Sequence, residues 1–176
     1  MVRGLYKFSQ HFVGLEDCFI LIGGTACDLW MGSQGLEFRA TKDLDIVLVV
    51  EALKPEFFQR LWTFIRAGAY QSHEQSERRP NFYRFTNPQG QTYSVMIELL
   101  THNVLDLPAD VHLTPIPVDD DVSSLSAILL DEAYYQYVIA SRIVINEVPT
   151  THHSGPLPDP AQGTCLSGSE CPKTNR

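Results

Sequence analysis

The sequence predicts a single domain of the α/β (α+β) class, a mixed sheet flanked by helices, and three observations lead to that prediction. The chain has 176 residues, about the length of one ordinary domain. Its composition, 44% hydrophobic and 19% charged, is typical of a globular protein and argues against a disordered one. Short apolar runs typical of strands are separated by stretches with helical spacing, as in folds that combine a sheet with helices.

The first half of the chain contains two apolar runs typical of strands, each followed by a helix pattern. Residues 19–22 form a short apolar run that ends at Gly23-Gly24, which indicates a strand or helix end, a tight turn and then a helix. Residues 43–50 read DLDIVLVV and predict a buried strand, which we place at the centre of the sheet. A helix should begin near Pro55, where the first turn tolerates proline, and end by Gly68.

The second half predicts a β-hairpin followed by three or four further elements. Residues 81–86 and 91–100 flank Asn87-Pro88-Gln89-Gly90, a turn-rich tetrad, so we expect a hairpin whose second arm carries Glu98. The elements expected beyond it are a strand near 111–116, a strand or the start of a helix at 125–130, a helix over 131–139 and one strand over 142–148.

The composition changes after Pro149, where Thr, His, Ser, Gly and Pro dominate and no apolar periodicity returns. We therefore expect residues 1–150 to form the domain and residues 151–176 to be a disordered tail. Cys18, Cys27, Cys165 and Cys171 lack the spacing of a disulfide framework and are expected to be reduced thiols. A zinc site made with His152 and His153 is rejected, because the ligand spacing fits no familiar pattern.

Charge and hydropathy exclude two broad classes of protein. A net charge of −8 argues against a surface that grips nucleic acid along its whole length. A solvated face explains the basic residues better than a local nucleic-acid patch does. The candidates for such a patch are Arg39, Lys42, Arg78, Arg79 and Arg84. The chain begins without a secretion-signal pattern, and no apolar run approaches the roughly 18 residues of a membrane span, so we expect a cytoplasmic protein.

Two aspartates on the predicted central strand are the first candidates for chemistry. Asp43 and Asp45 are two residues apart, so both side chains emerge on one face of the strand. A hard cation such as Mg²⁺ prefers oxygen ligands and takes one or two of them from carboxylates, leaving the rest to substrate phosphates and water. The pair therefore predicts a site for Mg²⁺ or Mn²⁺.

Two further motifs could serve the same site. Glu98 lies in MIELL on another strand pattern, where a carboxylate between apolar neighbours needs a partner. In two-metal phosphoryl chemistry a third carboxylate activates the attacking hydroxyl, so Glu98 is the candidate base. Gly23-Gly24-Thr25 precedes a helix start, where backbone N–H groups hold phosphates. A dinucleotide-binding fold is excluded, because G-x-G-x-x-G is absent after the first strand.

The order of these motifs resembles a known family. The stretch GGTACDLW followed by RATKDLDIVL is similar to the Gly-Gly/Ser and Asp-x-Asp motifs of nucleotidyltransferases, and specifically to the AbiEii/AbiGii type of bacterial toxin–antitoxin and abortive-infection systems. MIELL and DDVSSLSAILLDEAYY also resemble that family. The resemblance extends from the first apolar run to Pro149.

The resemblance implies a fold, an activity and a set of site residues. It implies a nucleotidyltransferase-like fold, in which Gly23, Gly24 and Thr25 hold the triphosphate, Arg39 lies near the phosphates, and Asp43 and Asp45 bind Mg²⁺. Glu98 is carried over as the third carboxylate. The implied activity is transfer of NMP from an NTP to an unidentified acceptor, which is RNA, protein or a small molecule, and the implied partner is a cognate antitoxin protein.

The tail departs from the family pattern. Such relatives continue past the last strand into a helix that reads approximately LIPLKA-x-A-x-x-DL, whose Lys helps to complete the active site. One back-translation of residues 158–170, read one base later, gives Leu-Ile-Pro-Leu-Lys-Ala-Arg-Ala-Cys-Leu-Asp-Leu. We therefore expect the tail to be a frame-shifted reading of that helix. The alternative function is then a non-catalytic, truncated remnant that keeps the fold and binds nucleotide.

Overall fold

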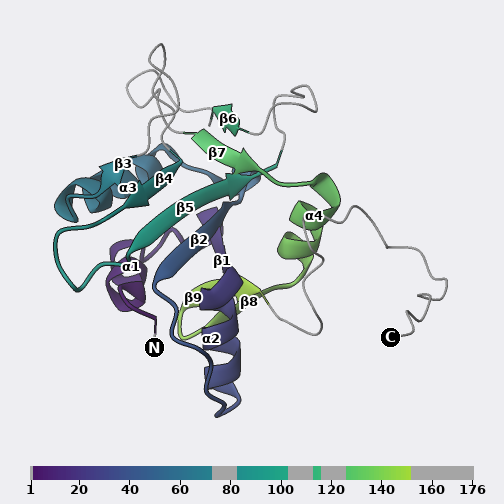
Figure 1. Cartoon of the computed structure of the whole chain (residues 1–176). Coiled ribbons are helices and arrows are strands. Elements are labelled where there is room, and N and C mark those ends of the chain that lie inside the picture. Colours follow the sequence, from purple (N-terminus) through teal and green to yellow (C-terminus); the bar gives the residue numbers. More distant parts are fainter. Residues whose placement is uncertain (1, 73–82, 103–112, 116–125, 152–176) are drawn as a thin grey trace, which may run out of the picture.

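A computed structural model describes residues 2–72, 83–102, 113–115 and 126–151. Within these ranges a mixed sheet carries helices on both faces, which confirms the predicted α/β class (Figure 1). The expected tail lies outside the described residues except for Thr151, so its disorder stays a prediction. None of the helices in the described ranges is long and apolar enough to cross a membrane.

The sheet is built from strands along the whole described chain. Its main path runs β3-β4-β5-β2-β1-β9-β8, and β7 pairs with both β5 and β6. The strands are β1 Phe19–Ile22, β2 Asp43–Leu48, β3 Gln71–Ser72, β4 Arg84–Thr86, β5 Met96–Thr101, β6 Leu113–Pro115, β7 Ser126–Leu129, β8 Arg142–Ile145 and β9 Val148–Thr151. The strand predicted to be central, β2, is the middle one of the path.

The pairing of β2 sets the position of the acidic residues. It runs antiparallel to β1 and parallel to β5. Asp45 is the register partner of Ile22 on β1 and of Glu98 on β5. Because paired residues on neighbouring strands share a face of the sheet, these three side chains project to the same side.

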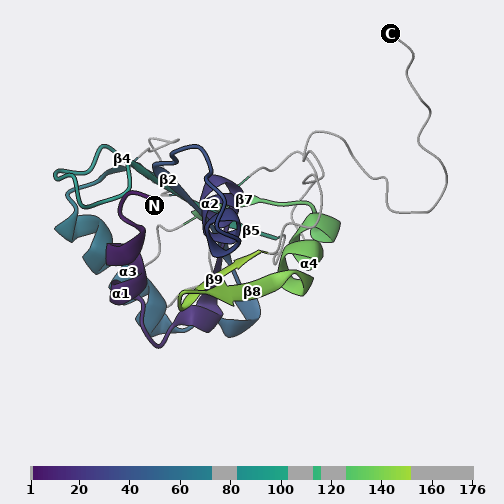
Figure 2. The same ribbon diagram turned by 90° about the horizontal axis from the view of Figure 1, so that it is seen from below.

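Helices cover the two faces unequally. The four α-helices of the described chain are α1 Leu5–His11, α2 Gly23–Ser33, α3 Pro55–Ala67 and α4 Glu132–Ala140, and two short 3₁₀ turns are η1 Glu16–Cys18 and η2 Val50–Ala52. Seen from below, α1 and α3 lie side by side on one side of the sheet, and α4 lies well apart from them (Figure 2). The predicted helices at α3 and α4 are confirmed, whereas α1 was not predicted.

Alternation along β2 separates two apolar clusters. Leu44, Ile46 and Leu48 face the main core, where α1 and α3 contribute a group of packed aromatic rings that includes Phe8, Phe57 and Phe64. Fully burying each such side chain is worth about 1.5–3 kcal/mol relative to leaving it exposed. On the opposite face, Val47, Ile20 and Ile22 pack against Tyr135 and Val138 of α4. The second face also carries the two aspartates, so α4 covers the part of the sheet beside them.

Two predicted elements differ in the structure. Residues 142–148, expected to be one strand, form β8 and the start of β9, which are joined by a tight turn at Asn146 and Glu147. Both turn residues have positive φ, 50° and 65°, which is the conformation of a two-residue hairpin turn. The other hairpin, β4–β5, is real but has shorter arms, because residues 87–95 connect them.

Candidate functional site

The two aspartates of β2 stand on the open part of the second sheet face. Asp43 and Asp45 are both half-buried, at the beginning of the strand. Burial raises the pKa of Asp45 to about 6, and the negative charges of Glu98 and Asp43 add to that effect, while Arg84 opposes it. The predicted same-face placement is therefore correct, and it crowds negative charge into a poorly hydrated spot.

Gly23 follows β1 directly and touches the second aspartate. Helix α2 begins at this residue, whose φ is +63°. An added Cβ would overlap the carboxylate oxygen Oδ2 of Asp45. Only glycine meets both conditions, since its positive φ carries no steric penalty and it has no side chain to fill the contact. The first N–H groups of α2, which lack partners within a helix, thus start beside Asp45.

The next two residues attach α2 to the loop and strand that carry the aspartates. A Cβ on Gly24 would lie 2.9 Å from Thr41 Oγ1, just before β2. The Thr25 hydroxyl donates a hydrogen bond to the backbone carbonyl of Asp43 at 2.9 Å, and Thr25 is only 1% exposed. The structure therefore gives the Thr25 side chain an anchoring contact, and the phosphate role expected for this residue would fall to its backbone N–H.

Glu98 pairs with Arg84, as expected for a carboxylate between apolar neighbours. Arg84 Nε donates to Glu98 Oε1 at 2.6 Å, and Arg84 Nη2 contacts the same oxygen. The pair lies across the β4–β5 hairpin, where Arg84 and Glu98 are register partners. The glutamate side chain is 15% exposed and the arginine side chain 39% exposed. Arg84, which the sequence suggested was part of a solvated face, is therefore a constituent of the acidic site.

Arg39 is a predicted site residue, but none of its described contacts involves Asp43 or Asp45. It is exposed in the loop between α2 and β2, and its guanidinium lies 5.9 Å from the Phe38 ring centroid. It lowers the pKa of the nearby Cys27 thiol, which burial raises overall. Arg84, and not Arg39, is the cation that acts on the pKa of Asp45.

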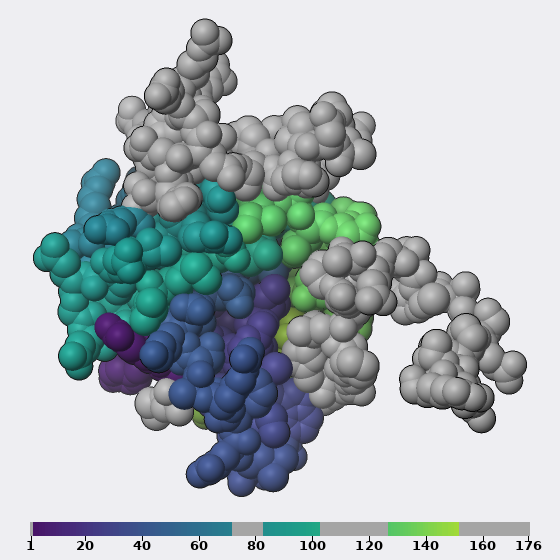
Figure 3. Space-filling view, viewed as in Figure 1, coloured from purple at the N-terminus to yellow at the C-terminus, as the bar shows by residue number. Residues whose placement is uncertain are grey.

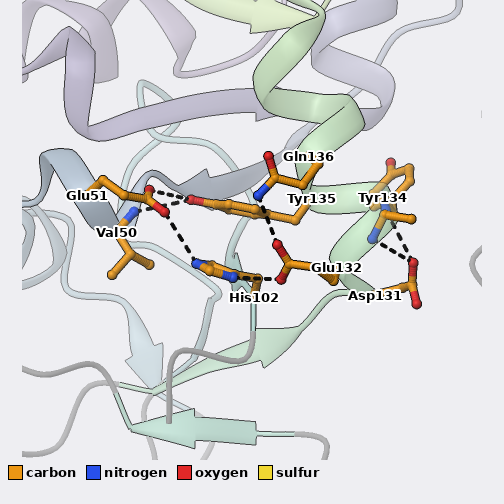
Figure 4. A network of polar contacts seen from close by, with 9 residues as sticks. Val50, Glu51, His102, Asp131, Glu132, Tyr134, Tyr135 and Gln136 are labelled. Carbon is orange, nitrogen blue, oxygen red and sulfur yellow. Dashed lines mark hydrogen bonds and ion pairs between the residues drawn. The ribbon is translucent and has the colours of Figure 1, made fainter. Parts of the chain in front are cut away.

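A polar network holds α4 against the sheet where β2 and β5 end, at the opposite end of these strands from the aspartates (Figure 4). The His102 ring, which follows β5, stacks on the Tyr135 ring with centroids 4.0 Å apart. Its Nδ1 lies 2.8 Å from Glu132 Oε2, and the Tyr135 hydroxyl donates to Glu51 Oε2 at 3.0 Å. The ends of β2 and β5 are thus tied to the first turn of α4. Sequence reasoning missed this network, since its members are far apart in the chain.

The donor set suits a hard divalent cation. Asp43 and Asp45 offer carboxylate oxygens on one face, where burial first, and then the charges of Glu98 and Asp43, raise the pKa of Asp45. Among the residues that the structure describes, no three His, Cys, Asp or Glu side chains converge closely enough to hold a metal alone. A cation bound by two carboxylates would complete its shell with substrate phosphates and water, as Mg²⁺ commonly does.

The surface around the site is continuous. The space-filling view shows the described chain as one body, in which the teal residues of the β4–β5 hairpin border the blue residues of α2 and β2 (Figure 3). The groups discussed above come from these segments. The register across β4, β5, β2 and β1 puts Arg84 on one side of Asp45 and Gly23, which follows Ile22, on the other.

Comparison with known proteins identifies a family. A family model described as "Nucleotidyl transferase AbiEii toxin, Type IV TA system" matches residues 8–133. The matched range includes Gly23, both aspartates and Glu98. Neither a search of curated proteins nor a search of solved structures finds a match.

Proposed function

Because the chain belongs to the AbiEii nucleotidyl transferase toxin family, we propose that it transfers NMP from an NTP to an acceptor in a metal-dependent reaction. The observation that carries this proposal is the placement of Asp43 and Asp45 on one face of β2, with Asp45 directly beside the first residue of α2. An NTP site needs carboxylates that bind a cation and helix N–H groups that bind phosphates.

Each part of the site has a role in this proposal. Asp43 and Asp45 would hold Mg²⁺ or Mn²⁺, and the cation, when bound, supplies charge stabilisation at the reacting phosphate. Gly23, Gly24 and the backbone of Thr25 would bind the β- and γ-phosphates at the N-terminus of α2. Arg39 stays a proposed phosphate neighbour that would have to reach in from its exposed loop.

Glu98 is the proposed base, and the reaction balances as follows. The acceptor hydroxyl gives its proton to Glu98, and its oxygen forms a bond to the α-phosphorus. The bond from that phosphorus to the bridging oxygen breaks, and pyrophosphate leaves with the electron pair. The register pairing of Glu98 with Asp45 supports this role, because it would put the base beside the cation that the aspartates hold.

The acceptor and the partner are proposed from the family alone. RNA, a protein or a small molecule could offer the hydroxyl, and a toxin of this family would be encoded with a cognate antitoxin. The family description supports a toxin–antitoxin context.

Calorimetry tests the site before any acceptor is known. Each of the four NTPs is titrated into the protein with and without Mg²⁺, and the titration is repeated with Asp43→Asn plus Asp45→Asn. Mg²⁺-dependent binding to the wild type that the double variant loses would support the proposal. Equal binding of metal-NTP by both proteins would show that the aspartates are not the site. Binding without transfer in labelled assays would favour a remnant that only holds nucleotide.

A further inference from the structure

A row of side chains crosses the site from β4 to β1. The register places Arg84, Glu98 and Asp45 as successive partners on β4, β5 and β2, and Ile22 on β1 comes next, immediately before Gly23. Arg84 thus stands at one end of the row and the start of α2 at the other. The order of groups across the face is guanidinium, carboxylate, carboxylate, helix N-terminus.

The ion pair at the end of the row involves only part of the hydrogen-bonding capacity of each side chain. Two of the three guanidinium nitrogens of Arg84, Nε and Nη2, converge on Oε1 of Glu98, so the pair leaves out Glu98 Oε2 and Arg84 Nη1. More than a third of the Arg84 side chain is exposed. Water therefore competes for the guanidinium, whereas the Glu98 side chain is only 15% exposed. The exposed guanidinium can exchange Glu98 for a second anion that offers it a better-matched contact.

The row also determines which phosphate lies near Arg84. If the β- and γ-phosphates occupy the N-terminus of α2, they lie on the Gly23 side of Asp45. The α-phosphate, held by the aspartates through their cation, then lies in the middle of the row. Arg84 approaches from the opposite side, so the α-phosphate is the first phosphate that its guanidinium meets.

We infer that Arg84 is a phosphate-binding residue that leaves Glu98 for a non-bridging oxygen of the α-phosphate when nucleotide binds. This inference rests on the proposed function. A guanidinium presents paired N–H donors that match the spacing of phosphate oxygens, so the exchange replaces contacts to one carboxylate oxygen with a better-matched pair. It also brings positive charge to the phosphate amid three carboxylates, and it frees Glu98 Oε1 for the acceptor hydroxyl.

The exchange predicts a specific pattern of binding. With Mg²⁺ present and acceptor absent, the preferred NTP and its matching NDP and NMP are titrated into wild type, Arg84→Gln, Arg84→Lys and Arg66→Gln. Arg66 is an exposed arginine of α3, on the other face of the sheet, so its change removes the same charge away from the site. Arg84→Gln should weaken all three nucleotides by a similar factor, about tenfold, as expected for the loss of a charge-assisted hydrogen-bond pair. Arg84→Lys should fall between, and Arg66→Gln should match the wild type.

A double-mutant cycle tests the change of partners itself. Glu98→Gln should tighten nucleotide binding, because Arg84 no longer has a competing anion, and this gain should disappear when Arg84→Gln is also present. Thermal melting of each variant shows whether it is folded.

Three results would overturn the inference. They are an Arg84→Gln effect no larger than that of Arg66→Gln, a loss that spares the NMP, and a Glu98→Gln gain that is the same in both backgrounds. The first result would show that Arg84 does not contact the nucleotide. The second would show that it contacts the β- or γ-phosphate, and the third would show that Glu98 affects binding only through its charge. A wild type that binds none of the four NTPs would instead contradict the proposed function, whatever Arg84 does.

Discussion

Gly23 and Asp45 are packed so closely that the glycine has no room for a β-carbon beside the carboxylate. The contact joins the start of α2 to the second aspartate of β2, and it makes the glycine a part of the acid site. A substitution here therefore has two effects, the strain of a positive φ and the displacement of Asp45, and a control glycine with positive φ but no neighbour separates them.

Gly23→Ala should destabilise the protein and abolish Mg²⁺–NTP binding. Gly35→Ala is the matched control, because Gly35 also has a positive φ, +73°, but has open space around its missing Cβ. Both variants should lose about 1–2 kcal/mol in chemical unfolding from backbone strain. Only the change at Gly23 should affect calorimetric nucleotide binding. Normal binding by Gly23→Ala would show that the contact with Asp45 is incidental.

Asp45→Asn should stabilise the protein without ligands at neutral pH. The fold raises the pKa of Asp45 to about 6 from its usual 3.8. The folded chain thus binds more protons than the unfolded chain between about pH 4 and pH 6, and the free energy of unfolding falls as the pH rises through that window. At pH 7 the substitution should add on the order of 1–3 kcal/mol, and below about pH 4 the gain should vanish. Denaturant unfolding at several pH values measures it.

The exposed Glu37 provides the control for that experiment, since Glu37→Gln removes one negative charge at a distance from β2 in the sequence. Its effect on unfolding should be small, within about 0.5 kcal/mol. If Asp45→Asn gains no more stability than this control at pH 7, the carboxylate is not strained by burial and its neighbours.

Glu98→Gln should lower turnover far more than nucleotide affinity. The base acts on the acceptor in the transition state, so its loss affects kcat while ground-state nucleotide binding is kept or improved. Losses of about 10²–10⁴-fold in rate are usual for a general base. Parallel measurement of transfer rate and calorimetric affinity checks this. A variant with unimpaired turnover would remove Glu98 from the mechanism.

Tyr135→Phe should loosen α4. The Tyr135 hydroxyl accepts a hydrogen bond from the Val50 N–H at 3.3 Å and donates to Glu51, and the residue is 1% exposed. Leaving the buried end of this network unpaired should cost about 1–2 kcal/mol in thermal or chemical unfolding. Tyr137→Phe is the control, because the Tyr137 side chain makes no hydrogen bond with the described residues. Equal effects of the two changes would show that the network does not hold the helix.

Glu147→Gly should stabilise the β8–β9 hairpin by about 0.5–1 kcal/mol, because glycine adopts a positive φ without steric cost. Glu147 has φ +65° next to Asn146 at +50°. Glu147→Ala removes the same charge but keeps a β-carbon, so it should not stabilise. A gain in melting temperature with alanine as large as with glycine would assign the effect to charge.

That turn also explains the main error of the sequence prediction. An Asn-Gly pair between two apolar runs would have predicted a hairpin, whereas Asn146-Glu147 hides the turn inside one β-branched stretch. Periodicity and composition correctly predicted β2, α3 and α4, whose apolar residues recur at strand or helix spacing, and left β1 open between a strand and a helix end. Helix α1 has only seven residues and no capping side chain at Gly4, so it gives little local signal.

The site could be predicted only in part. The two aspartates follow from the period of a strand, but the Arg84–Glu98 pair depends on the register of β4 against β5. Nine residues, 87–95, connect these strands, and a connection of that length leaves the register open. The overlap of Gly23 with Asp45 likewise depends on the antiparallel pairing of β1 with β2, which is a tertiary property.

The most direct measurement of the central claim follows two labels through one reaction. The protein is incubated with Mg²⁺, a total RNA or lysate acceptor, and each NTP labelled at either the α- or the γ-phosphate. Nucleotidyl transfer predicts that the α-label enters the acceptor and the γ-label leaves as pyrophosphate, and that Asp43→Asn plus Asp45→Asn abolishes both. Entry of the γ-label into the acceptor, or undiminished α-labelling by the double variant, would contradict the account.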